Sequence, residues 1–126
     1  MTKTGQAKIL IVEDDRYAAL YIRQTLEIFG YDAVEIAVSG EGAVQKAEEM
    51  KADVVLMDIV LRGKMDGIEA AGIIKEQLGI PIIYLTAYSD DQRVQRAKAT
   101  NPVGYLLKPF QQSDLQHGIE IALQRS

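Results

Sequence analysis

Acidic, hydroxyl and basic side chains follow directly after short apolar runs in this 126-residue sequence. They are, in chain order, Glu13, Asp14, Asp58, Thr86 and Lys108. Short apolar runs are typical of buried strands, and the carboxyl ends of parallel strands lie along one edge of a sheet. We therefore expect these side chains to converge on a single site.

The chemistry that these residue types favour together is phosphoryl transfer to a carboxylate. Crowded carboxylates repel one another and raise their own pKa values unless a cation neutralises them. Hard oxygen ligands without histidine or cysteine favour Mg²⁺ over zinc. Lys108 can pair with one phosphate oxygen, and Thr86 can donate a hydrogen bond to another. Asp58 can then act as the nucleophile that forms an aspartyl phosphate.

Each of these residues also has a purely structural interpretation. Acids after buried strands often cap the following helix, and Asp15 is interpreted as such an N-cap rather than as a metal ligand. Taken alone, Thr86 is typical of a turn and Lys108 of a solvated charge. His117 is the single histidine and is assigned no role. The joint occurrence of complementary groups at several strand ends favours a functional site over these separate explanations.

The elements that must position these residues alternate along the chain. Strands are expected at 8–12, 33–38, 52–58, 81–85 and 103–107, and helices at 16–29, 39–50, 67–78, 89–99 and from 113 onward. Capping-box spacings begin at Ser89 and Ser113. The alternation predicts an α/β fold with a doubly wound, five-stranded parallel sheet and helices on both faces. The helix at 89–99 has few large apolar residues, mainly Val94, so we expect it to pack weakly.

The composition limits the class of protein. With 48% hydrophobic and 25% charged residues, the sequence is typical of one globular domain. The lack of cysteine excludes disulfides and thiolate metal sites. No apolar stretch is long enough to span a bilayer, no leader is visible, and a net charge of −4 provides no basic patch for nucleic acid. We expect a cytoplasmic protein that binds neither membranes nor, directly, nucleic acid.

With these residues placed, the chain resembles the receiver domain of two-component response regulators, and in particular the single-domain, chemotaxis-regulator-like class. The matching motifs keep the family's order and spacing, and they read ILIVEDD at 9–15, VLMD at 55–58, MDG at 65–67, LTA at 85–87 and KPF at 108–110. The resemblance covers roughly 8–124 and implies a flavodoxin-like sheet with strand order 2-1-3-4-5. It also implies that 1–126 is one receiver domain without an output domain.

The resemblance implies a role for each matching residue of the site. Asp58 matches the phosphoacceptor, which takes its phosphoryl group from the phosphohistidine of a histidine kinase. Asp14 matches a direct Mg²⁺ ligand, and Glu13 matches an acid that commonly acts on the metal through water. The backbone carbonyl of Val60 matches the third protein ligand, beside Asp58 itself. Lys108 matches the lysine that pairs with the phosphoryl group.

The resemblance also implies a signalling switch rather than a metabolic enzyme, with slow autodephosphorylation as its own reaction. Thr86 and Tyr105 match the pair whose movement remodels the surface of the fourth helix, fifth strand and fifth helix. Pro109 follows Lys108 through a peptide bond that is usually cis in the family. The implied partners are a sensor histidine kinase or phosphotransfer protein and an unidentified downstream protein. The domain is expected to be a monomer or a phosphorylation-dependent dimer.

Some positions depart from the family's usual pattern. Glu13 stands where aspartate is commoner, and its longer side chain could alter the geometry of a metal site. The loop at 59–67 is one residue longer than usual and contains Lys64. Val60 and Tyr88 occupy positions that tune the loss of the phosphoryl group in the family.

Three other functions compete with this one. A Mg²⁺-dependent phosphatase typically has a second aspartate two residues after its nucleophile, where this chain has Val60. A flavodoxin-like binder of flavin or nucleotide needs a phosphate-binding loop after the first strand. Here the acids at 13–15 would repel a phosphate unless a metal were present. A receiver-like scaffold that has lost phosphorylation is disfavoured by the complete set of acids, threonine and lysine.

Overall fold

The computed structural model describes residues 7–87 and 91–125 of the chain. Its core is a five-stranded parallel sheet with the strand order β2-β1-β3-β4-β5. The strands are β1 (Lys8–Val12), β2 (Ala33–Ala37), β3 (Val54–Asp58), β4 (Ile82–Thr86) and β5 (Gly104–Leu107). This sheet confirms the predicted fold class and strand order.

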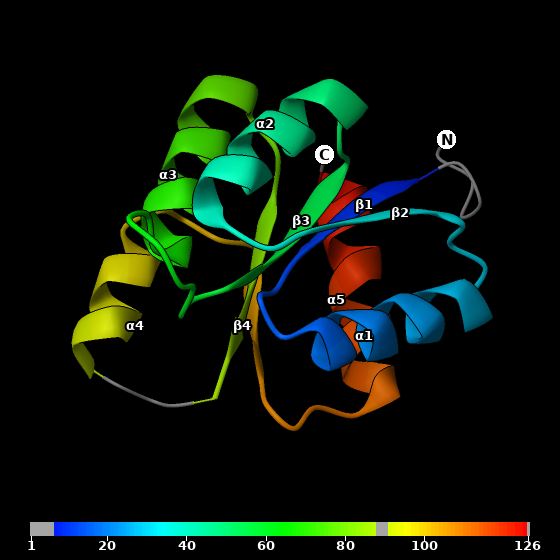
Figure 1. Cartoon of the computed structure of the whole chain (residues 1–126). Helices are drawn as coiled ribbons and strands as arrows, with labels where there is room; N and C mark the ends of the chain where they lie inside the picture. Colours follow the sequence, from blue (N-terminus) through cyan, green and yellow to red (C-terminus); the bar gives the residue numbers. More distant parts are fainter. Residues whose placement is uncertain (1–6, 88–90, 126) are drawn as a thin grey trace.

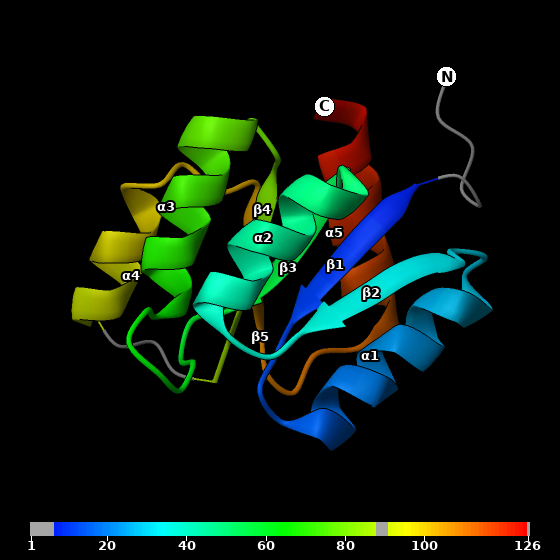
Figure 2. The same ribbon diagram turned by 45° about the horizontal axis from the view of Figure 1, so that its top comes forward.

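Helices cover both faces of the sheet, which gives three layers (Figures 1 and 2). The helices are α1 (Arg16–Ile28), α2 (Gly40–Met50), α3 (Gly67–Leu78), α4 (Asp91–Lys98) and α5 (Gln112–Arg125). Buried residues of α2, α3 and α4 belong to one apolar cluster, and those of α1 and α5 belong to a second cluster on the opposite face. The helices therefore lie on both sides of a parallel sheet, as the alternating sequence predicts.

The apolar runs become strands because the sheet has two buried faces. In β3, Val55 and Met57 belong to the cluster beneath α2 and α3, whereas Val54 and Leu56 belong to the cluster beneath α1 and α5. All five residues of β3 are buried, which accounts for its uninterrupted apolar sequence. The edge strand β2 alternates instead, and its Glu35 is exposed.

Side-chain caps fix where the helices begin. The carboxylate of Asp15 accepts hydrogen bonds from the backbone N–H groups of Tyr17 and Ala18, which confirms it as the N-cap of α1. Asp66 and Glu69 form a capping box at α3, with N–H to carboxylate distances of 2.8 and 3.3 Å. The spacing Asp-x-x-Glu at 66–69 is typical of such a capping box. The caps place the strand-to-helix loops at the carboxyl edge of the sheet.

Several predicted boundaries are wrong by one or two residues, such as the end of β2 at Ala37 rather than 38 and the start of β4 at Ile82 rather than 81. Strand β3 begins at Val54 rather than at 52, and the carboxylate of Asp53 just before it accepts the N–H of Lys8 at 2.8 Å. Helix α5 begins at Gln112, so Ser113 lies inside the helix and is not its N-cap. Asp114 accepts the N–H of Gln111 at 3.2 Å instead. The predicted capping box at Ser89 and the position Tyr88 lie outside the described residues.

Helix α4 packs on the sheet through few apolar side chains, as predicted. Among its residues with described side chains, only Ala97 is buried. Polar contacts add to this packing: Arg96 Nη2 lies 3.0 Å from Asp66 Oδ2, and the Tyr84 hydroxyl lies 2.7 Å from that of Thr100. Burial raises the pKa of Tyr84 to about 12.

No helix within residues 7–87 and 91–125 has both the length and the apolar character that a membrane crossing requires.

Candidate functional site

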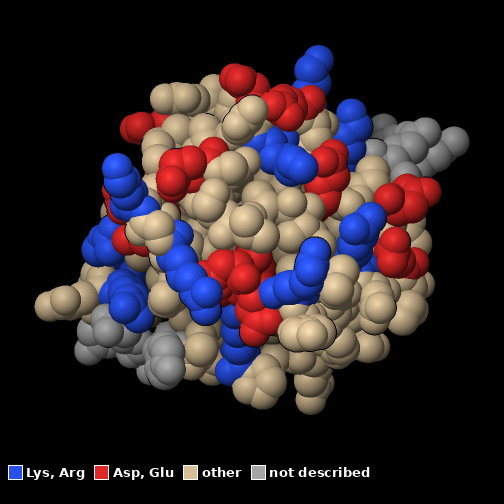
Figure 3. Space-filling model, viewed as in Figure 1, with Lys and Arg blue, Asp and Glu red and all other residues tan. Residues whose placement is uncertain are grey.

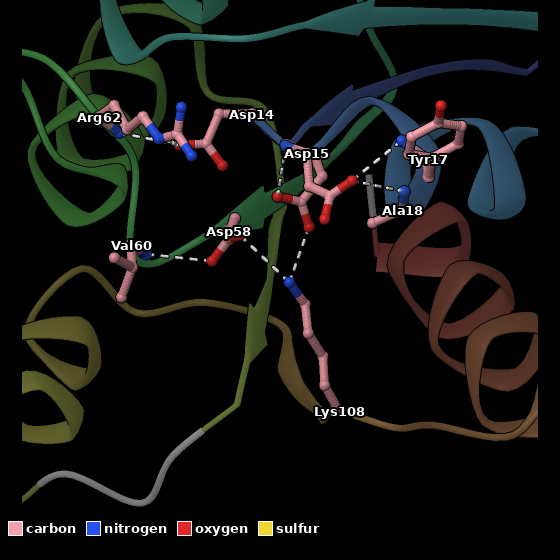
Figure 4. Close-up of polar contacts among 9 residues, drawn as sticks. Asp14, Asp15, Tyr17, Ala18, Asp58, Val60, Arg62 and Lys108 are labelled. Atoms are coloured by element: carbon pink, nitrogen blue, oxygen red, sulfur yellow. Dashed lines mark hydrogen bonds and ion pairs between the residues drawn. The ribbon is translucent and has the colours of Figure 1, made fainter.

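Asp14, Asp58 and Lys108 lie close together at the carboxyl edge of the sheet (Figure 4). Strand β1 pairs with β3 so that Val12 is opposite Met57, which places Glu13 beside Asp58. Thr86 ends the neighbouring strand β4, and its carbonyl oxygen accepts the N–H of Lys108 at 2.7 Å. The parallel register therefore joins residues from four distant parts of the chain.

Lys108 lies between two carboxylates of the site. Its Nζ donates hydrogen bonds to Glu13 Oε1 at 2.7 Å and to Asp58 Oδ2 at 3.1 Å. Glu13 and Asp58 are only 2% and 7% exposed, so water cannot screen their charges well. The lysine is the cation that balances them in this structure.

Burial and the neighbouring charges shift the pKa values of this cluster in opposite directions. Burial raises the pKa of Glu13 above its ordinary value, and the neighbouring Asp58 carboxylate raises it further, although Lys108 acts in the other direction. For Lys108, burial alone would lower the pKa, but the contacts with Glu13 and Asp58 outweigh it and raise the pKa. The lysine therefore stays protonated at neutral pH, whereas burial and Asp58 make ionisation of Glu13 less favourable than in water.

The backbone around Asp58 holds the carboxylate in a fixed orientation. Its Oδ1 accepts the N–H of Val60 at 3.0 Å, so the chain turns directly after β3. Gly67, the first residue of helix α3, packs directly against the backbone of Asp58. The contact is so close that a Cβ at position 67 would overlap the Asp58 carbonyl oxygen. The loop and the helix together keep Asp58 at the surface end of a buried strand.

Asp14 makes contacts that the sequence did not predict. Its Oδ2 accepts the backbone N–H of Arg62 at 3.1 Å, and Arg62 Nε lies 3.7 Å from the same oxygen. Arg62 belongs to the loop between β3 and α3. The unusual length of that loop marks it as a candidate for contacts with the site, but nothing in the sequence indicates that Arg62 would contact Asp14.

Carboxylate oxygens of Glu13, Asp14 and Asp58 all lie within 4.8 Å of one another. Three hard oxygen donors at this spacing fit a small divalent cation such as Mg²⁺, which one or two carboxylates and water usually bind. The donor set contains no nitrogen or sulfur ligand, which disfavours zinc. The predicted role of the Val60 carbonyl stays a prediction.

The two predicted switch residues lie on neighbouring strands. Thr86 is half-buried at the end of β4, and it is paired in register with Leu107 of β5. Tyr105 is 40% exposed, and its ring stacks on that of Tyr84 with centroids 5.9 Å apart. The peptide bond between Lys108 and Pro109 is cis, as the resemblance predicts.

The sequence model of the response regulator receiver domain matches residues 9–120. The chain belongs to this family. The transcriptional regulatory protein PdtaR of Mycobacterium tuberculosis is 39% identical over 94% of this chain and 57% of its own length. The transcriptional regulatory protein ResD of Bacillus subtilis is 34% identical over the full chain and 52% of its own length. This receiver domain thus spans about half the length of these curated relatives.

Solved receiver domains have the same fold. The signal receiver domain of a modulated diguanylate cyclase from Desulfovibrio desulfuricans G20 is 42% identical, with a TM-score of 0.89 over 94% of both chains. Chemotaxis protein CheY4 of Vibrio cholerae is 31% identical, with a TM-score of 0.83 over 93% of this chain and 98% of its own. The chain is therefore a receiver domain of the two-component signalling family, whose members receive phosphoryl groups from histidine kinases.

Proposed function

We propose that this receiver domain is a phosphorylation-dependent switch in which Asp58 accepts the phosphoryl group. The donor would be the phosphohistidine of a sensor histidine kinase or of a phosphotransfer protein. The observation that carries the proposal is that Asp58 lies within hydrogen-bond distance of Lys108 and close to the carboxylates of Glu13 and Asp14, at the ends of β1, β3 and β5. In this arrangement a nucleophile, a cation and a cluster of hard oxygen ligands lie side by side.

The proposed reaction transfers one phosphoryl group between two nucleophiles. A bond forms between an oxygen of Asp58 and phosphorus, and the bond from phosphorus to the histidine nitrogen breaks with its electron pair staying on the imidazole. The N–H of Val60 holds Asp58 in orientation through Oδ1. Lys108, already 3.1 Å from Asp58 Oδ2, would then pair with an oxygen of the transferred group. Its raised pKa keeps it charged throughout.

We also propose that Glu13, Asp14, Asp58 and the backbone carbonyl of Val60 hold a Mg²⁺ ion. Bound there, Mg²⁺ would supply positive charge to a site that otherwise holds three carboxylates. The carboxylate spacing and the burial of Glu13 support this assignment. Residues 1–126 would act as one receiver unit.

The output of the switch would be a change in the surface formed by α4, β5 and α5. Thr86 and Tyr105 connect the site to this surface through neighbouring strands. The exposed side chains of Tyr105 and Leu107 give β5 an apolar outer face for a downstream protein. Some curated relatives are named as DNA-binding regulators, and we propose that this domain itself contacts protein rather than nucleic acid. A phosphorylation-dependent dimer is the other proposed outcome.

The test of the phosphoacceptor is the intact mass after incubation with acetyl phosphate, with and without Mg²⁺. The wild type should gain one phosphoryl group only when Mg²⁺ is present, and Asp58→Asn should gain none. Asp32→Asn, an exposed aspartate away from the site, serves as the matched control and should behave like the wild type. A gain that persists in Asp58→Asn would place the acceptor elsewhere. No gain in the wild type would favour a scaffold role.

A further inference from the structure

The three acids of the site have different cationic partners. Glu13 and Asp58 share the ammonium group of Lys108, whereas Asp14 contacts Arg62. Figure 4 shows the side chain of Arg62 lying over Asp14 on the side away from Lys108. In the space-filling view, acidic atoms gather in the middle of this face, and lysine and arginine side chains flank them (Figure 3). Arg62 therefore needs an explanation of its own.

Arg62 is attached to Asp14 in two ways of unequal strength. Its backbone N–H donates to Asp14 Oδ2 at 3.1 Å, and this bond fixes the loop to the end of β1. The guanidinium Nε is 3.7 Å from the same oxygen, which is an ion-pair distance rather than a hydrogen bond. The side chain of Arg62 is 92% exposed, so it can leave Asp14 while the backbone stays in place.

The loop crosses the site between two of the proposed metal ligands. Val60 is bonded to Asp58 through its N–H, and two residues later Arg62 is bonded to Asp14. The next residue of the loop, Gly63, has a φ of +105°, which favours glycine. This backbone path delivers the Arg62 side chain onto the acid that Lys108 does not contact.

We propose that Arg62 is a built-in competitor of the divalent cation at Asp14. Its guanidinium lies 3.7 Å from a carboxylate oxygen of Asp14, one of the proposed metal ligands, and a metal ion bound to the same carboxylate would repel it. Arg62 therefore lowers the affinity of the site for the metal, and bound metal weakens the contact between the Arg62 guanidinium and Asp14. The inference rests on the proposed Mg²⁺ site.

The effect must be modest because the ion pair is exposed. An exposed ion pair corresponds to a change of roughly two- to fivefold in an equilibrium constant. Linkage makes the effect reciprocal, so Arg62 weakens metal binding by the same factor by which the metal weakens the Arg62 contact. The competition would set the Mg²⁺ concentration at which the site fills, without changing the ligands themselves.

Calorimetric titration of the full chain with MgCl₂ tests the proposal. We expect Arg62→Gln to bind Mg²⁺ roughly two- to fivefold more tightly than the wild type at low ionic strength. Arg62→Lys keeps the charge and should stay near the wild type. Lys64→Gln is the matched control, because Lys64 is an exposed cation of the same loop and should leave the affinity unchanged. At about 1 M salt the gain in Arg62→Gln should shrink because the charges are screened.

The outcomes separate this inference from the proposed metal site. If the wild type binds Mg²⁺ and Arg62→Gln binds it no more tightly, Arg62 is not a competitor and the metal site stands. If Lys64→Gln binds as tightly as Arg62→Gln, the general charge of the loop acts, not the pair with Asp14, and the inference is overturned. If neither the wild type nor Arg62→Gln binds Mg²⁺, both the metal site and the inference are wrong.

Discussion

The site holds negative charge where burial makes it costly. Glu13 is 2% exposed and lies beside Asp58, with Lys108 as their shared cation. Buried ion pairs of this kind often add little stability, because the loss of hydration offsets the attraction between the charges. We therefore attribute the cluster to function rather than to folding.

The first prediction concerns Glu13→Gln and pH. The pKa of Glu13 lies above its ordinary value of 4.5 because of burial and Asp58, so the folded state holds the proton more tightly than the unfolded state. Its contribution to stability is therefore present below the unfolded pKa and is lost as pH rises through the folded pKa. We expect the free energy of unfolding of Glu13→Gln, minus that of the wild type, to increase between pH 4 and pH 7.

Urea denaturation without Mg²⁺, at constant ionic strength, measures this difference. Glu48→Gln, an exposed change on α2, controls for the loss of one negative charge. If the difference for Glu13→Gln stays constant or decreases with pH, the pKa of Glu13 is not raised in the folded protein.

At the scale of elements, the contact between α3 and β3 determines where Asp58 lies. Gly67 is the first residue of α3, and its N–H donates to the carbonyl of Ile59 at 3.1 Å. The helix approaches the strand end so closely that only a residue without a Cβ fits there. The capping box of Asp66 and Glu69 fixes the same turn from the other side.

We predict that Gly67→Ala destabilises the fold and displaces the acceptor. The added Cβ would meet the backbone of Asp58, which cannot move aside as a side chain could, so we expect a loss of about 1–3 kcal/mol or more. Phosphorylation by acetyl phosphate should also slow. Thermal or urea unfolding measures the first effect, and intact mass over time measures the second.

The matched control lies in the same helix. In Gly72→Ala the new Cβ would lie 3.8 Å from the nearest atom, a methyl group of Thr100, which is an ordinary contact. Alanine in a helix interior should then stabilise the protein by about 0.5–1 kcal/mol. Equal effects at both positions would contradict the close contact proposed for Gly67.

At the scale of the whole molecule, helices α3 and α4 lie in the same layer but bury different numbers of side chains against the sheet. The buried residues of α3 are Gly67, Ile68, Ala70, Ala71 and Ile74, whereas Ala97 is the only buried residue of α4 among those with described side chains. Elements with few buried apolar contacts open at lower free energy. We predict that the amides of α4 exchange with deuterium faster than those of α3 in the unphosphorylated protein. Similar protection in the two helices would show that the polar contacts of α4 suffice to hold it.

The same measurement tests how the site communicates with the surface. After phosphorylation we expect the exchange of α4 and β5 to change, and in Tyr105→Ala this change should be lost although the phosphoryl group is still gained. Tyr17→Ala, an 84% exposed tyrosine on α1, should respond like the wild type. If the change persists in Tyr105→Ala, the tyrosine does not couple the site to α4.

Much of this protein follows from its sequence. Apolar runs and helical spacing specify which residues each element buries, and a parallel sheet brings the ends of such strands to one edge. The sequence therefore predicts one site that contains Glu13, Asp14, Asp58, Thr86 and Lys108. Helix boundaries were less predictable at Ser113, because several nearby polar side chains can cap one helix and packing selects among them.

Only the tertiary structure decided which atoms meet. Lys108 contacts Glu13 and Asp58 from 95 and 50 residues away, and Arg62 contacts Asp14 from 48 residues away. Periodicity determines the face on which a residue lies, but it does not determine the path of a loop or the reach of a side chain. The path of the loop after β3 depends on the hydrogen bonds of Asp58 and on the close packing of Gly67, and these arise only when the sheet and helices are assembled.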